Sequence, residues 1–160
     1  MSSVKLTTNY SIRHPERGSA LLEFGLIAIV LFTFIFGIID FGRALFTYHF
    51  VANAAREATR YASVRGYLCA APMTGCDATQ TSIQTYLQGE AQGSGLNSKL
   101  LSVNASWPIE TTSPAVCAQT PNYQGCTVQV QVSYPFQFIF PFLPTSAINM
   151  SSTSATVITQ

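Results

Sequence analysis

The sequence predicts an α+β protein in which a long N-terminal helix packs on a small antiparallel sheet of about three strands. A long apolar run lies near the N-terminus, an amphipathic stretch without a helix breaker follows it, and alternating segments come later. The 160 residues suffice for one domain and an anchor. We expect a polar leader (1–18), a transmembrane helix (19–40), an amphipathic continuation of that helix (41–66) and a small α+β domain (67–160).

The apolar run has the length of a membrane span. Residues 24–39 include no charged residue and no proline, and extending the run back to Ala20 gives twenty positions with a single charge, Glu23. A helix of that length covers about 30 Å, the thickness of a hydrocarbon core. We therefore expect this part of the helix to lie in lipid.

The next stretch, from Asp40 to Gly66, is amphipathic. One apolar stripe recurs at spacings of three and four residues: Phe41, Leu45, Tyr48, Ala52, Ala55, Thr59 and Ala62. Because Arg56, Glu57 and Arg60 lie mostly off this stripe, we expect one continuous helix, half in lipid and half in water.

Beyond residue 66 the pattern changes to short elements. A second helix is expected over about 81–92, capped by Asp77 or Thr79. Alternation predicts strands over 101–107 and 128–134, separated by a long loop, and a weaker strand over about 148–158 whose alternation slips at Ser152, as at a β-bulge. These strands and the long helix make up the expected core.

All four cysteines lie after the apolar run, at positions 69, 76, 117 and 126. An even number on one side of a span favours disulfides in an oxidising compartment. Zinc is the rival, but zinc sites usually use Cys pairs two to four residues apart, whereas six and eight residues separate these pairs. Of the three possible connectivities, proximity favours Cys69–Cys76 and Cys117–Cys126.

The junction between leader and span carries a recognisable motif. A basic leader ends at Gly18, four uncharged residues beginning with Ser19 follow, and then come Glu23 and Phe24. This arrangement resembles the class III signal of type IV pilins and pseudopilins. With the later segments DFGRAL (from Asp40) and AAREATRYA (from Ala54), the stretch 17–66 resembles the TadE-like family, minor pseudopilins of the tight-adherence (Tad) pilus.

The resemblance implies a function and its site. It implies a pilin-like fold, cleavage by a prepilin peptidase between Gly18 and Ser19, and a Glu23 that meets the new Ser19 amine of a neighbouring subunit. The implied partners are that peptidase, the inner-membrane assembly platform, other pilin-like subunits and the lipid bilayer. The implied location is the bacterial inner membrane, with a cytoplasmic N-terminus and a periplasmic or extracytoplasmic domain. The alternative is an unprocessed bitopic protein whose outer domain binds or senses a ligand.

A densely aromatic segment follows the second predicted strand, at 135–144. Its phenylalanines are Phe136, Phe138, Phe140 and Phe142, and three prolines make it a poor central strand. We expect the phenylalanines to fold back onto the helix, because so small a domain needs core. The alternative is an exposed apolar surface that contacts the membrane or a partner subunit.

Composition argues against two other classes. Charged residues make up 9% of the chain and the net charge is +1, unlike the clustered Lys and Arg of nucleic-acid-binding proteins. His14 and His49 have no Cys or Asp at a spacing typical of a triad or a metal site. We therefore expect no catalytic residue, metal or cofactor.

Overall fold

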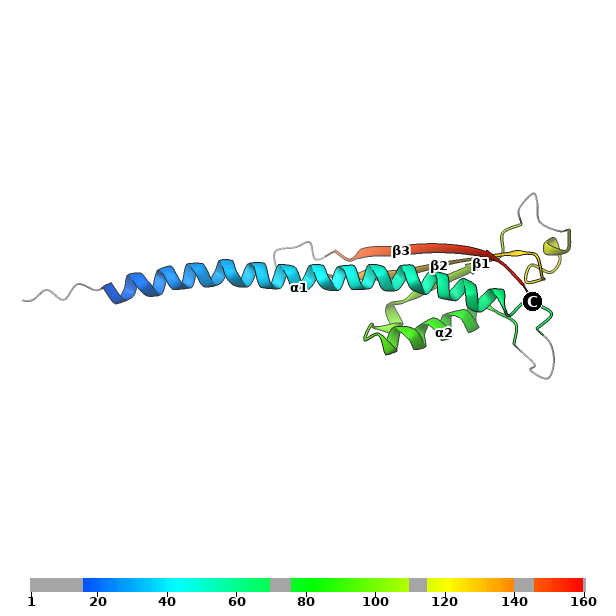
Figure 1. Cartoon of the computed structure of the whole chain (residues 1–160), viewed down its shortest axis with the longest axis horizontal. Coiled ribbons are helices and arrows are strands. Elements are labelled where there is room, and N and C mark those ends of the chain that lie inside the picture. The colour runs from blue at the N-terminus through cyan, green and yellow to red at the C-terminus, as the bar shows by residue number, and fades with distance from the viewer. Residues whose placement is uncertain (1–15, 70–75, 110–114, 140–145, 160) are drawn as a thin grey trace, which may run out of the picture. The chain divides into compact units, whose positions relative to one another are not determined.

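The computed structural model describes residues 16–69, 76–109, 115–139 and 146–159. The chain forms two compact units, residues 1–38 and 39–160. Its elements are α1 (Glu16–Ser63), α2 (Gln80–Gly93), the 3₁₀ helix η1 (Ser98–Leu100), β1 (Ser102–Ser106), the 3₁₀ helix η2 (Ala115–Ala118), β2 (Thr127–Phe136) and β3 (Ile148–Val157) (Figure 1). A long N-terminal helix packed on an antiparallel sheet confirms the predicted α+β class.

The sheet has three antiparallel strands in the order β1-β2-β3. Val132 of the central strand β2 pairs with Val103 of β1 on one side and with Ser152 of β3 on the other. Alternate side chains of β2 are buried, as the two-residue period of a strand requires. The buried set is Val128, Val130, Val132, Tyr134 and Phe136.

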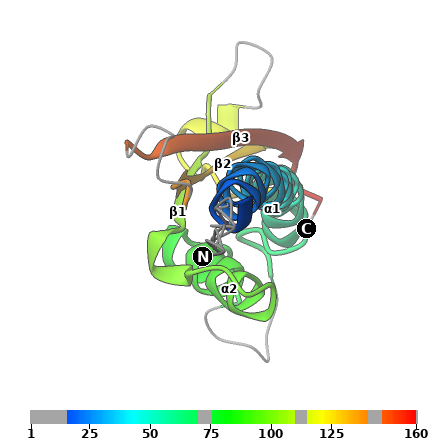
Figure 2. The same ribbon diagram turned by 90° about the vertical axis from the view of Figure 1, so that its left-hand side faces the viewer.

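The second half of α1 forms the centre of the domain, with the sheet and α2 against two of its sides (Figures 1 and 2). Its buried apolar residues are small: Val51, Ala54, Ala55, Ala58 and Ala62. Short side chains allow a strand to approach closely, and the Thr59 and Ser154 hydroxyls lie 3.1 Å apart across this contact. The helix is therefore an integral part of the domain core.

The buried face of α1 differs in phase from the predicted stripe. Phe41 is 64% exposed, Leu45 44% and Tyr48 57%, whereas Ala55 and Ala62 are fully buried. The first part of the predicted stripe consists of large side chains and is exposed, whereas its later members Ala55, Thr59 and Ala62 are buried. The domain instead packs on the side of α1 where the smallest side chains recur.

Helix α1 ends at Ser63, three residues before Gly66, where the pattern predicted its end. The Ser63 carbonyl accepts hydrogen bonds from the backbone N–H (2.8 Å) and the hydroxyl (3.1 Å) of Thr159. The Arg65 carbonyl accepts from the Ala78 N–H at 2.7 Å. Bonds to distant segments thus replace the carbonyl partners that another helical turn would supply.

Helix α2 begins at the predicted Thr79 cap. The Thr79 hydroxyl accepts from the Ser82 N–H, and the Ser82 hydroxyl accepts from the Thr79 N–H, which makes a capping box. The Gln80 amide then bonds the edge of β1: it donates to the Val103 carbonyl and accepts from the Ala105 N–H. The Gln80 side chain thus pairs two backbone groups of β1 that the edge of a sheet otherwise leaves without a partner strand.

The strands correct three local predictions. β2 continues through Pro135 to Phe136, because β1 pairing stops at Ser133 and a missing N–H is tolerated where only β3 is adjacent. β3 pairs without interruption through Ser152, so the predicted bulge is absent from this strand. The alternation of apolar and polar residues in β3 is irregular for another reason. Ser154, which faces Thr59, is polar, whereas Val157 on the other face of the strand is apolar and 51% exposed. The loop expected before β2 contains η2.

Candidate functional site

The predicted processing junction lies in the first turns of α1. Gly18 and Ser19 follow Glu16, the first helical residue, and both are exposed. The first four N–H groups of a helix have no intrahelical acceptor, so this turn opens more easily than any interior turn. The junction therefore combines exposure with weak local hydrogen bonding.

Packing does not explain why residue 18 is glycine. Among the described residues, a Cβ built on Gly18 meets no atom within 4 Å, and the same holds at Gly25 and Gly37. The described part of the chain thus leaves room for a larger side chain at position 18.

Glu23 is exposed and follows Ser19 by one helical turn. Residues four apart lie on the same face of an α-helix, so the carboxylate and the Ser19 backbone share one side of α1. The side chains around Glu23 are apolar and exposed, including Leu22 (78%) and Phe24 (71%). A single carboxylate is thus presented on an otherwise apolar helix surface.

The helix that carries this junction is a candidate membrane span. Among the described residues it is the one helix long and apolar enough to cross a bilayer, and no part of its apolar window is buried. Exposure of so many large side chains, such as Leu26, Ile29 and Phe34, is expected for a lipid-facing surface.

A buried carboxylate lies where the second unit begins. Asp40 is 3% exposed, and its Oδ1 accepts from Arg43, three residues further along the helix, at 2.7 Å. Its Oδ2 accepts from the Ile139 backbone N–H at 2.9 Å. The bond to Ile139 was not foreseen: it joins residues 99 positions apart, and an aspartate after an apolar run indicates only a boundary. Asp40 thus fastens the aromatic segment to α1.

The described part of the aromatic segment is divided between core and surface. Phe136 is 3% exposed, and the Arg43 guanidinium carbon lies 5.4 Å from the centre of its ring. Phe138 is half-buried and contacts the Phe136 ring edge-on, with centroids 5.2 Å apart. Phe136 is therefore not available as a contact surface. Phe140 and Phe142 lie outside the described residues.

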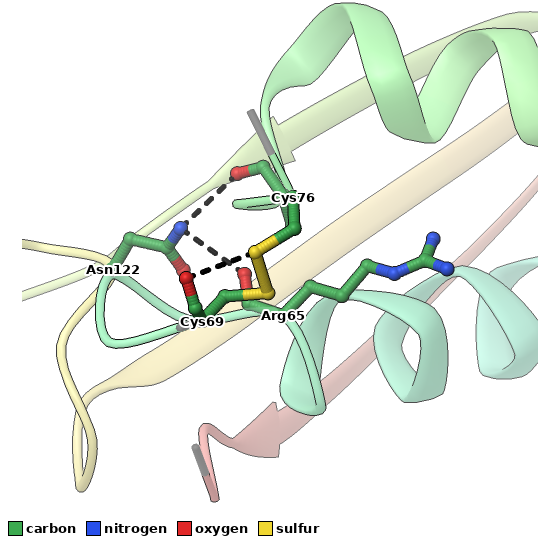
Figure 3. Close-up of a disulfide and its surroundings, with 5 residues drawn as sticks. Arg65, Cys69, Cys76 and Asn122 are labelled. Atoms are coloured by element: carbon green, nitrogen blue, oxygen red, sulfur yellow. Dashed lines mark hydrogen bonds between the residues drawn. A yellow bond between two sulfur atoms is a disulfide. The ribbon is translucent and has the colours of Figure 1, made fainter. Parts of the chain in front are cut away.

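Both cysteine pairs form disulfides, Cys69–Cys76 and Cys117–Cys126, the pairing that sequence proximity favours. Figure 3 shows the first pair beside Asn122, whose side-chain amide donates to the carbonyl oxygens of Arg65 (3.4 Å) and Ala78 (3.3 Å). The second pair is buried and fastens η2 to the start of β2. The disulfides thus hold the connections at the end of the domain where α1 stops.

Aromatic contacts join α1 to α2. The rings of Tyr61 and Tyr86 stack with centroids 4.5 Å apart, and the Arg65 guanidinium carbon lies 3.9 Å from the centre of the Tyr61 ring. The Tyr86 hydroxyl donates to Glu57 at 3.1 Å. Desolvation first, and then this bond and the Glu57 charge, raise the pKa of Tyr86 above its ordinary value of 10.0. The hydroxyl is therefore held in its neutral form.

Two grooves lie on the described part of the domain. One, near Arg43, Phe46 and Leu96, has a volume of about 690 Å³, and another, near His49, Glu57 and Tyr86, about 490 Å³. The second contains the Tyr86 hydroxyl that donates to Glu57. Among the described residues no cluster of three His, Cys, Asp or Glu is placed to hold a metal ion.

Comparison with known proteins bears on the N-terminal part of the chain. The family model described as TadE-like protein matches residues 18–60. The match confirms the resemblance inferred from the junction and the helix, and it begins at Gly18. Comparisons with curated proteins and with solved structures found no match.

Proposed function

We propose, from the match of residues 18–60 to the TadE-like family, that this chain is a membrane-anchored minor pseudopilin that takes part in assembling a Tad-type adhesion pilus. One observation carries the proposal: the matched segment begins at Gly18, at the entry to the candidate span, with Glu23 one turn after Ser19. A sensor domain with an ordinary anchor does not require that combination.

The proposed processing step is hydrolysis of the Gly18–Ser19 peptide bond by a prepilin peptidase. Water adds across the amide, which leaves a carboxylate on Gly18 and an ammonium group on Ser19. The leader 1–18 is released on the cytoplasmic side, whereas the apolar helix stays in the bilayer. This differs from ordinary signal cleavage, which removes the apolar segment.

Glycine at position 18 suits this step. A peptidase at the membrane surface has to draw the backbone out of the helix, and the first turn of α1 has the fewest bonds to lose. Without a Cβ, Gly18 also takes up extended conformations that fit closely against a protease. Since the chain itself leaves open space at this position, the proposed constraint lies in the peptidase.

Glu23 is assigned the role of subunit register. A carboxylate near the lipid interface is unfavourable on its own, and an ammonium group that pairs with it offsets the desolvation of both. In the proposed assembly Glu23 meets the Ser19 amine of a neighbouring pilin-like subunit. The helices would then be fixed in one axial register at the inner membrane, where the assembly platform acts.

The decisive experiment compares two glycine variants in the native host. Gly18→Val is expected to block cleavage and leave a precursor that is longer by the leader. Gly25→Val is the matched control, because a Cβ there also meets no atom within 4 Å, and it should be cleaved normally. N-terminal sequencing and mass measurement of the membrane-extracted protein give the result.

A second variant separates assembly from processing. Glu23→Gln removes the charge and keeps the size, so cleavage should proceed while incorporation into pili falls. Glu57→Gln serves as control, because that carboxylate bonds Tyr86 within the domain. A mature protein that begins at Met1 or Ser2, or pili that persist with Gly18→Val, would favour the unprocessed binding or sensing protein instead.

A further inference from the structure

The exposed face of α1 stays apolar beyond the candidate span. Within the second unit, Phe41 is 64% exposed, Leu45 44% and Phe46 52%. Further along the same helix the exposed residues become polar, at Asn53, Arg56, Glu57 and Arg60. The change from apolar to polar surface thus occurs after residue 48, about two turns later than Asp40 suggests.

Ile139 adds an apolar side chain at the same level. It is 74% exposed, yet its backbone N–H bonds the buried Asp40 carboxylate, which anchors it next to the start of this helix stretch. Exposed apolar side chains are common. This one differs because the bond from its backbone N–H to the buried Asp40 carboxylate fixes its position. We call Phe41, Leu45, Phe46 and Ile139 the apolar collar.

The position of the apolar collar corresponds to one layer of a bilayer. Phe41 and Phe46 follow Ile38 in α1 by a helical rise of about 4.5 and 12 Å, at 1.5 Å per residue. The headgroup layer adds roughly 5–8 Å on each side of a 30 Å hydrocarbon core. Aromatic and aliphatic side chains are favourable there, and Arg43, with 43% of its side chain exposed, lies within reach of phosphate groups.

We propose that the apolar collar rests in the headgroup and upper acyl layer of the membrane that α1 spans, so that the base of the domain is seated on lipid. Continuity with the candidate span selects lipid as the occupant, because Phe41, Leu45 and Phe46 belong to the same helix as the candidate span and follow it directly in sequence. The proposal requires that α1 span a bilayer and is independent of cleavage and of pilus assembly.

The test uses single-tryptophan chains in bilayers with brominated acyl chains, which quench nearby indoles. Trp107 is replaced by Phe, a change that also removes a buried indole N–H without a hydrogen-bond partner among the described residues. Tryptophan is then placed at Ile139 or Phe46. The full-length chain is reconstituted at one copy per phosphatidylcholine nanodisc, so that no neighbouring subunit can cover the collar.

Val157→Trp is the matched control. Val157 is 51% exposed at the far end of β3, next to Thr159, which bonds Ser63. Ser63 lies 24 residues after Ile39, about 36 Å along the helix. We expect fluorescence of the Ile139→Trp and Phe46→Trp chains to fall at least twofold in brominated lipid, and that of the Val157→Trp chain to stay unchanged.

The role of Asp40 has its own readout. Adding Asp40→Ala removes the acceptor for the Ile139 N–H, so quenching of the Ile139→Trp chain should weaken while that of the Phe46→Trp chain persists. Quenching at both collar positions no stronger than in the Val157→Trp chain overturns the proposal. Quenching at Phe46→Trp alone, with Asp40 intact, overturns the assignment of Ile139 to the collar.

Discussion

The two halves of α1 differ in which side chains they expose and which they bury. In the candidate span the large residues, such as Leu26 and Phe34, are exposed and none of the apolar window is buried. In the domain half the buried residues are mostly alanines, and the large side chains at Arg56 and Arg60 point to solvent. Side-chain size, more than apolarity, therefore distinguishes the exposed surface of the candidate span from the surface that packs in the domain.

This difference shows what each half is built for. A lipid-facing helix gains from bulk, because each large apolar side chain fills space among acyl chains. The domain half gains from small side chains, because Ala55, Ala58 and Ala62 let β3 approach until Thr59 and Ser154 bond. Substitutions that alter size should therefore act differently in the two halves.

The largest contrast is expected from shortening matched isoleucines. Ile83, on α2, is fully buried in the domain core, whereas Ile27 in the candidate span is 60% exposed. Ile83→Ala should lower the free energy of unfolding of the domain by about 2–5 kcal/mol through lost burial and a cavity. Ile27→Ala should leave it unchanged. Urea unfolding of the full-length protein in detergent, followed by Trp107 fluorescence, measures both, and equal effects would contradict a separate domain core.

Enlarging one alanine in each half of α1 should also destabilise the domain only when the alanine is in the domain half, but by less than shortening Ile83. Ala58 is fully buried against the domain, whereas Ala28 in the candidate span is half-exposed. Ala58→Leu overfills the close contact and should cost about 1–3 kcal/mol, whereas Ala28→Leu should leave the unfolding free energy of the domain as it was. Thermal unfolding by circular dichroism checks this. A stable Ala58→Leu domain would show that the helix–sheet contact is looser than the alanines indicate.

The smallest effect is expected at the Tyr86–Glu57 bond, between α1 and α2. Tyr86→Phe removes the bond, keeps the ring against Tyr61, and should cost about 0.5–1.5 kcal/mol. Because the folded-state pKa of Tyr86 is raised, the hydroxyl contributes fully below its unfolded pKa near 10 and loses its contribution as pH rises through the folded value. The difference between wild type and variant should be constant from pH 7 to 9 and shrink above pH 10. A difference that grows with pH would refute this sign.

Much of the fold could be predicted, because the spacing of apolar residues and the residues that cap or end helices and strands determine it locally. The long helix, the Thr79 cap and the alternation of β2 follow from local patterns that tertiary structure did not override. The apolar stripe did not locate the buried face in the first part of this stretch, because Phe41, Leu45 and Tyr48 are large, apolar and exposed. The β3 register was obscured for a similar reason: its helix-facing residues are serines and threonines, so polarity does not mark the inner face.

The proposed junction is local in sequence: Gly18, Ser19 and Glu23 lie within one and a half helical turns, and its assignment as a processing site remains a prediction. The hydrogen bond between the Ile139 N–H and Asp40 has no local sequence pattern that predicts it, because it depends on how the chain returns from β2 to α1. Contacts of that kind become visible only once the sheet is placed on the helix.

The bonds between Thr159 and Ser63 have a consequence for the cooperativity of unfolding. The final carbonyl of α1 receives its partner from the segment that follows β3, and Ile158, just before Thr159, is fully buried. Removing Ile158 and Thr159 would therefore leave the helix end without its hydrogen-bond donors and one core position empty at the same time. The helix end and the core are thus stabilised by the same short segment, so both should be lost together when it detaches.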